Sequence, residues 1–159
     1  MEREKHPLDR MDRKILDILQ REGRLPITEV AQRVGLSTSP CAERVKRMER
    51  DGVITGYCAL VSPAAVDKSL LVFVEIKLAA KGADVFDAVR DELLHMPEVL
   101  ECHLVSGEFD YLLKFRLRDM REYRGLLGSI LKRLPVAAES RSSIVMEEVK
   151  ESTYLPVSR

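Results

Sequence analysis

Hydroxyl and basic side chains are concentrated between residues 37 and 50 of this 159-residue chain. Arginine and lysine bind phosphate oxygens and the acceptor edge of guanine, while serine and threonine hydroxyls donate to or accept from several base edges. Because the chain contains no asparagine, the frequent asparagine–adenine pair is excluded, and Gln32 is the nearest amide that could replace it. The residues predicted to contact double-stranded DNA are Gln32, Ser37, Thr38, Ser39, Glu43, Arg44, Lys46, Arg47 and Arg50.

A second group of residues suited to binding surrounds Gly107, in the run HLVSGEFDYLLKF that starts at His103. A glycine between two strands lets backbone N–H groups approach a ligand closely, and free amides suit a carboxylate. The carboxylate of Asp110 could hold an ammonium group, so the turn offers partners for both ends of an amino acid. The alternative is an ordinary hairpin, in which Gly107 supplies the turn geometry and Asp110 is solvated or caps the turn. The residues alone leave both interpretations open.

Residues for catalysis or metal binding do not occur in a usable pattern. His103 has no second histidine or cysteine at metal-ligand spacing, and we expect it to pack at an interface. Glu147 and Glu148 would point to opposite faces of a strand. The sequence contains no nucleophile–base arrangement, phosphate loop or dinucleotide fingerprint. We therefore expect no catalytic residues, no metal and no cofactor, and a small-molecule enzyme is the less favoured alternative.

The elements that must position the basic residues are three short helices. Apolar residues recur at helical spacing in three stretches, and Gly23 and Gly35 end the first two. Ser37 is suited to cap the third helix, and Pro40 is tolerated there because it falls in the first turn. A small ribbon after the helices would complete a winged helix-turn-helix. The helices are predicted over residues 9–22, 26–34 and 37–51, and two short strands bent at Thr55-Gly56 over residues 53–61.

The charge of the whole chain is balanced, with 26 basic and 26 acidic residues. DNA binding needs only a local basic stripe, because phosphate contacts are screened within about 8 Å at physiological salt. One alternative is that Arg44, Lys46, Arg47 and Arg50 form a solvated face paired with neighbouring glutamates. Another is that the helices are a protein-interaction module. The combination of turn, cap, basic flank and ribbon favours DNA over both.

The second half of the chain follows a different pattern, with β-prone runs separated by two helices. Its order βαββαβ predicts a ferredoxin-like domain with both helices on one face of an antiparallel sheet. Phe73, Val105 and Val145 are expected on the other face, where they would be exposed to solvent in a lone domain. A dimer is the natural way to cover them. The elements are predicted as a connector over 62–69, strands over 70–78, 99–106, 111–117 and 141–149, and helices over 85–94 and from Asp119 to Pro135.

Targeting and redox signals indicate where such a chain works. No apolar run approaches the roughly 20 residues of a membrane-spanning helix, and the charged N-terminus has no signal-peptide core. Cys41, Cys58 and Cys102 are far apart and form no paired motif, which argues against disulfides and structural zinc. We expect no membrane partner and a cytoplasmic location.

Five long motifs occur along the chain in a fixed order. They are LDRMDRKIL from Leu8, VGLSTSPCAERVKRMERDGVITGY from Val34, LLVFVEI from Leu70, ECHLVSGEFDYLLK from Glu101 and IVMEEVKES from Ile144. In these motifs the chain resembles the Lrp/AsnC family of bacterial and archaeal regulators, and it is most similar to the leucine-responsive branch. The resemblance covers nearly the whole chain. One departure is Pro26, which stands where a polar helix cap would be more usual.

This resemblance implies an α+β chain with a winged helix-turn-helix DNA-binding domain (residues 1–61), a linker (62–69) and a ferredoxin-like ligand-binding and oligomerisation domain (70–159). It implies a sequence-specific transcriptional regulator of amino-acid metabolism genes whose dimers assemble into tetramers or octamers. An amino-acid effector, leucine or a related one, would bind between protomers near the turn after the second sheet strand. The ligand-binding residues that the resemblance suggests are Leu104, Gly107, Glu108, Phe109, Asp110, Ile144 and Val145.

Overall fold

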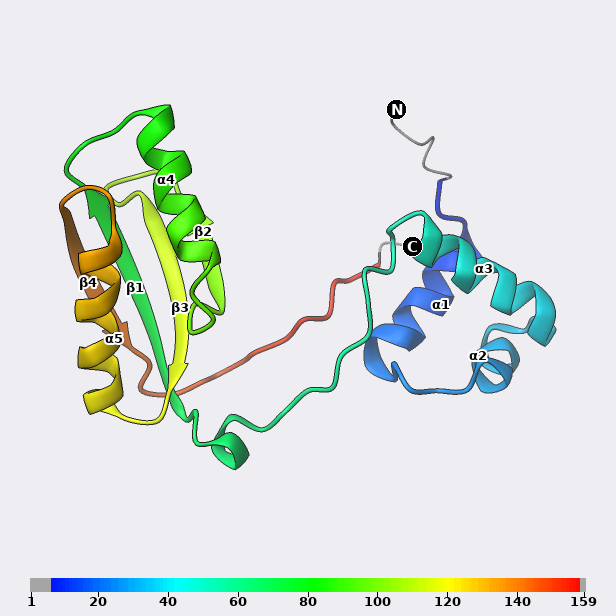
Figure 1. Cartoon of the computed structure of the whole chain (residues 1–159). Helices are drawn as coiled ribbons and strands as arrows, with labels where there is room; N and C mark the ends of the chain where they lie inside the picture. Colours follow the sequence, from blue (N-terminus) through cyan, green and yellow to red (C-terminus); the bar gives the residue numbers. More distant parts are fainter. Residues whose placement is uncertain (1–6, 158–159) are drawn as a thin grey trace. The chain divides into compact units, whose positions relative to one another are not determined.

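The computed structural model describes residues 7–157 and contains two compact units (Figure 1). One unit holds the chain up to Leu60 together with the tail from Lys150, and the other is Val61–Val149. This grouping differs from the predicted domains, which placed the tail in the C-terminal domain. The predicted domain ends at residues 1 and 159 lie outside the described residues.

The first unit contains the three predicted helices, α1 (Arg10–Arg21), α2 (Ile27–Val34) and α3 (Thr38–Arg50). Local signals place their ends. The Asp9 side chain caps α1 by accepting from the N–H of Asp12 at 2.8 Å, and the Asp12 side chain returns the bond to the N–H of Asp9 at 3.1 Å. Gly35, with a φ of 77°, adopts the left-handed conformation that ends α2. Ser37 takes the N-cap position of α3, but its side chain makes no capping bond.

The core of this unit forms where the apolar stripes of the three helices meet. The spacing of its members follows the helical period that the sequence predicted. Val45 on α3 is half-buried and packs against this core. The fully or nearly fully buried apolar residues are Ile15, Val30, Ala31, Val34, Cys41 and Met48.

The predicted pair of strands over residues 53–61 is wrong, because no strand forms there in the part of the chain that the structure describes. The N–H groups of Val53 and Ile54 both donate to the carbonyl of Met48, so this stretch closes the end of α3 instead of pairing with itself. Beyond Tyr57 the side chains are exposed. An isolated two-stranded ribbon of this length would be marginally stable at best.

The second unit has the predicted order βαββαβ. Its strands form one antiparallel sheet in the order β2-β3-β1-β4, the ferredoxin-like arrangement. The predicted connector contains a short 3-10 turn, Pro63–Val66. The elements are β1 (Leu70–Leu78), α4 (Ala83–Leu94), β2 (Glu101–Leu104), β3 (Tyr111–Leu117), α5 (Met120–Arg133) and β4 (Ala138–Ile144).

Alternate strand residues separate the two faces of this sheet. The face that carries Val74, Leu113 and Phe115 shares one buried core with α4 and α5, so both helices cover the same side (Figure 1). The opposite face carries Phe73 and charged residues, and no helix of the second unit covers it. Leu94, the last residue of α4, points away from this core and is 71% exposed.

Two strands are displaced from their predicted bounds. β4 was expected over 141–149, but its pairing with β1 starts at Leu78–Ala138 and stops at Val72–Ile144, two residues from the first residue of β1. β2 covers only Glu101–Leu104 because its register with β3 ends at Tyr111. Val105 and Val145 therefore lie just beyond strand ends, and of the three residues predicted for the open face only Phe73 sits within a strand on it.

Candidate functional site

The exposed face of α3 carries a polar stripe that matches the predicted DNA-reading residues. Ser39, Glu43, Lys46 and Arg50 occupy positions i, i+4, i+7 and i+11, which share one side of a helix. The side chains of Lys46 and Arg50 are 70% and 66% exposed, and their ion pairs, with Glu43 and Asp51, are long at 3.6 Å. Gln32, Ser37 and Thr38 are also exposed.

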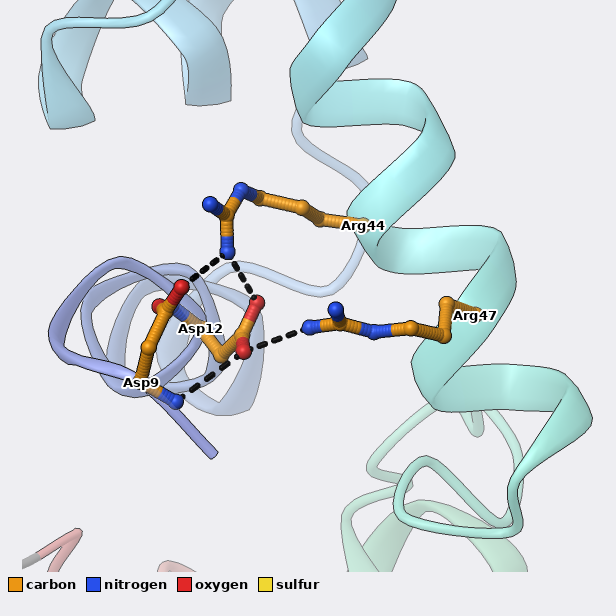
Figure 2. A network of polar contacts seen from close by, with 4 residues as sticks. All are labelled: Asp9, Asp12, Arg44 and Arg47. Carbon is orange, nitrogen blue, oxygen red and sulfur yellow. Dashed lines mark hydrogen bonds and ion pairs between the residues drawn. The ribbon is translucent and has the colours of Figure 1, made fainter. Parts of the chain in front are cut away.

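Arg44 and Arg47 lie on a different side of α3 and turn toward α1 (Figure 2). Arg44 Nη1 is 2.9 Å from Asp12 Oδ1 and 2.5 Å from Asp9 Oδ2, and Arg47 Nη2 is 2.5 Å from Asp12 Oδ2. Asp12 itself is completely buried. The predicted DNA contacts thus divide into seven exposed residues and two arginines that join α3 to α1.

The electrostatics of this network favour the charged forms of Asp9 and Arg44. The N–H of Asp12, and after it the guanidinium of Arg44, hold the pKa of Asp9 below its ordinary value. The same carboxylates raise the pKa of Arg44. Arg44 and Arg47 retain side-chain exposures of only 28% and 27%. Their main effect is therefore to fix the position of the helix that carries the exposed stripe.

Sequence reasoning missed Asp12, although a local signal was present. Aspartates at positions 9 and 12 have the spacing of a capping box, and the structure shows both of its hydrogen bonds. That signal predicts the start of α1. It does not reveal that the same buried carboxylate binds two arginines from another helix, because those lie 32 and 35 residues further along the chain.

The C-terminal tail packs on α1 within the first unit. The ring of Tyr154 lies 4.3 Å below the guanidinium of Arg21, and its hydroxyl donates to Asp17 at 2.5 Å. This hydroxyl, followed by Arg21, lowers the pKa of Asp17. Gln20 forms two hydrogen bonds with the backbone of Leu155, at 2.7 and 3.0 Å. Residues at the far end of the sequence thereby become part of the helical unit.

The turn between β2 and β3 contains Gly107 and the residues around it that were predicted to bind a carboxylate. Gly107 has a φ of 125°, a conformation that side chains rarely adopt. Leu104 and Glu108 are exposed, and Phe109 is half-buried. Among the described residues, the N–H groups of residues 106–109 have no hydrogen-bond acceptor. Four backbone donors are thus free to bind an anion.

Asp110 is buried at the start of β3 and already has two partners. Its carboxylate accepts from the N–H of Leu78 at 2.8 Å and pairs with the ammonium of Lys81 at 2.7 Å. Burial works to raise the pKa of Asp110, but Lys81 and the Leu78 N–H outweigh it and hold the pKa below its ordinary value. The carboxylate therefore binds an ammonium group, and in this structure the ammonium belongs to Lys81.

Ile144 and Val145 lie far from this turn within one chain. Ile144 pairs with Val72, whereas Tyr111, next to Asp110, pairs with Ile76. These levels differ by four residues along β1, or about 13 Å. The two groups also lie toward opposite edges of the sheet. One chain therefore does not bring the last-strand residues and the turn together around a single amino acid.

Known proteins match both units of the chain. Residues 8–55 match a family model described as winged helix-turn-helix DNA-binding, and residues 71–155 match the Lrp/AsnC ligand binding domain. The chain belongs to the Lrp/AsnC family. It is a transcriptional regulator of that family, with a DNA-binding unit and a ligand-binding unit.

Relatives of this Lrp/AsnC protein align over almost its whole length. The leucine-responsive regulatory protein of Escherichia coli K12 is 53% identical over 150 residues, which is 94% of this chain and 92% of the relative. A regulator from Neisseria meningitidis, solved as a complex with L-methionine, has a TM-score of 0.89 at 37% identity and covers 94% of this chain and 97% of its own. An AsnC-family regulator from Agrobacterium tumefaciens has the same TM-score at 36% identity, with the same two coverages.

Within residues 7–157, no group of three or more histidine, cysteine or acidic residues could hold a metal ion. None of the helices described there is long and apolar enough to cross a membrane. Cys41, Cys58 and Cys102 are all free thiols.

Proposed function

We propose that this Lrp/AsnC protein regulates genes of amino-acid metabolism by inserting α3 into the major groove of specific DNA sites. The observation that carries the proposal is the exposed stripe of Ser39, Glu43, Lys46 and Arg50 on a helix that is anchored from behind by Asp12. The stripe combines groups that can read base edges with cations that grip phosphate. With no asparagine in the chain, part of the specificity would come from DNA shape and deformability.

The effector in this proposal is a free amino acid bound between protomers. Its carboxylate would accept from the N–H groups of the turn at Gly107, and its ammonium would replace that of Lys81 beside Asp110. Leu104, Glu108 and Phe109 would surround it. Because Ile144 and Val145 are about 13 Å along β1 from the turn of their own chain, they would reach the effector from a neighbouring copy. The methionine complex of the Neisseria regulator and the leucine-responsive relatives support an amino acid with an apolar side chain.

Oligomerisation follows from the same proposal. The open face of the sheet places Phe73 opposite Lys114, and Glu75 opposite Leu112, so apolar and charged groups alternate there. A second copy would cover this face, and dimers would assemble further into tetramers or octamers. Effector binding would shift the equilibrium between such assemblies by its differential affinity for them. We propose a non-enzymatic role in the cytoplasm, where this DNA is found.

DNA binding and effector response can be tested with genomic fragments. The purified protein, mixed with fragmented genomic DNA, is expected to retain a limited set of fragments, and leucine or methionine is expected to change that set. Sequencing the retained fragments with and without each amino acid provides the measurement. Retention of DNA without sequence preference, or no retention at low salt, would contradict the proposal.

Replacing Asp110 with asparagine is expected to weaken effector binding at least about tenfold, because the lost charge-assisted hydrogen bond contributes roughly 1.5–3 kcal/mol. Asparagine keeps an acceptor for the N–H of Leu78, so the fold should persist. Isothermal titration with leucine and methionine provides the measurement. Lys81→Gln is the matched control: removing the competing ammonium should leave effector affinity equal or higher. Unchanged affinity in the Asp110 variant would place the ammonium elsewhere.

A further inference from the structure

α1 carries a row of cations on the side that faces away from α3. Arg10, Lys14 and Arg21 follow one another at i, i+4 and i+11, and Arg13 lies beside them. At about 100° per residue, the row is roughly opposite the side of α1 that holds Asp12 and contacts α3. A single duplex lying against the exposed stripe of α3 would therefore not meet these cations.

The row lines a cavity of about 1030 Å³ formed by α1, α2 and the C-terminal tail. Five cations line it, and Asp17 is the sole acidic lining residue in the described part of the chain. Tyr154 forms part of the wall, and its hydroxyl donates a hydrogen bond to Asp17. The cationic lining residues are Arg10, Arg13, Lys14, Arg21 and Arg33.

Internal ion pairs account for only part of this charge. Arg21 pairs with Asp17 at 3.2 Å, and Arg33 pairs with Glu22. For Arg10, Arg13 and Lys14, no acidic side chain among residues 7–157 lies within ion-pair distance. The cavity consequently keeps a positive charge that the described residues do not neutralise.

Helix stability does not explain these three cations. Arg10 and Arg13 lie in the first turns of α1, where the helix dipole favours negative charge. Arg10 and Lys14 are like charges at i, i+4, a spacing that is unfavourable in a helix. Residues that weaken their own helix and converge on one cavity point to a bound anion.

We propose that this cavity, which we call the α1 site, binds backbone phosphates of duplex DNA at a segment other than the one that α3 enters. From Arg10 to Arg21 the row spans about 16 Å of helix axis, which suits a series of backbone phosphates better than one small anion. The proposal rests on DNA being the partner of the helical unit. Each helical unit would then bind DNA through two faces. α3 would recognise the sequence, and the α1 site would bind the backbone of a further segment.

The test compares a triple variant, Arg10→Gln, Arg13→Gln and Lys14→Gln, on two kinds of DNA. On fragments of several hundred base pairs, the dependence of log K on log salt should become less steep by up to about 3, since each lost phosphate contact removes about 0.9. On a short duplex that holds one recognition site, the salt dependence should match that of the wild type. Arg121→Gln, Arg124→Gln and Lys132→Gln on α5 remove the same charge and should change neither measurement.

Other outcomes overturn the inference. If the triple variant and the wild type show equal salt dependence on both DNAs, the α1 site does not bind DNA. If the salt dependence of the variant falls equally on the long and the short DNA, the cations contact the same segment that α3 enters. A third outcome assigns the cavity to free polyphosphates. In it, tripolyphosphate displaces long DNA from the wild type but not from the triple variant, and the two proteins show the same salt dependence of DNA binding. If wild-type protein binds neither DNA, the proposed function fails instead.

Folding of the triple variant is itself a check. Because the three cations disfavour α1, the variant should melt at the same temperature as the wild type or higher, and a lower melting temperature contradicts the argument. If the triple variant does not fold, Arg10→Gln alone replaces it in the test, because Arg10 is exposed. This single substitution should make the dependence of log K on log salt less steep by about 1 on long DNA.

Discussion

Replacing Asp12 with asparagine is expected to lower the free energy of unfolding of the helical unit by about 3 kcal/mol. The carboxylate is completely buried and accepts from Arg44, Arg47 and the N–H of Asp9. An asparagine of the same size cannot neutralise either guanidinium, and one of its positions becomes a donor facing a donor. This loss is at the lower end of that for broken buried ion pairs, because water still reaches both arginines.

Urea unfolding followed by far-ultraviolet circular dichroism provides the measurement for Asp12→Asn. Glu29→Gln, at an exposed position on α2, removes one negative charge from the same unit and should change stability by less than about 0.5 kcal/mol. A double-mutant cycle with Arg47→Gln should give a coupling energy of about 1–3 kcal/mol. Additive effects of the two substitutions would show that the Asp12–Arg47 contact contributes nothing of its own.

The elements that sequence alone could predict are those whose limits are local. Asp9 caps α1 and Gly35 ends α2 wherever the rest of the chain lies, so these ends were placed correctly. The limits of a strand depend on its partner. β4 pairs with β1 only as far as Ile144, opposite Val72 near the first residue of β1, and no residue near 144 carries that information. A strand also needs a partner in order to form at all. Residues 53–61 have a strand-like sequence pattern but form no strand, because they do not pair with one another.

The candidate site divides in the same way between residue type and tertiary contact. Residue type and helical spacing were enough to predict the exposed stripe that contains Lys46 and Arg50. They could not separate those residues from Arg44 and Arg47, because the difference lies in a buried carboxylate on another helix. The contact of Tyr154 with α1 joins residues 137 positions apart, and the tail has no periodic pattern that would predict it.

Replacing both Lys46 and Arg50 with glutamine is expected to weaken DNA binding at least about tenfold at low salt, since charge-assisted hydrogen bonds contribute roughly 1.5–3 kcal/mol each. The Lys46 ammonium and the Arg50 guanidinium are exposed, and among residues 7–157 their ion pairs, with Glu43 and Asp51, are long at 3.6 Å. Loss of two phosphate contacts should also make the dependence of log K on log salt less steep by about 2 per bound helical unit. The weakening should be uniform across DNA sequences, because phosphate carries no sequence information.

The decisive comparison is with Arg44→Gln and Arg47→Gln, measured by fluorescence anisotropy on the same duplex across a range of salt. These substitutions also remove two positive charges from α3. Because both guanidinium groups are held by Asp9 and Asp12, we expect the salt dependence to stay close to that of the wild type while the urea midpoint falls. Salt dependence that falls equally in the two pairs of variants would mean that the arginines leave Asp12 when DNA binds. In that case the network would be a feature of the free protein, and α3 would grip DNA with all four cations.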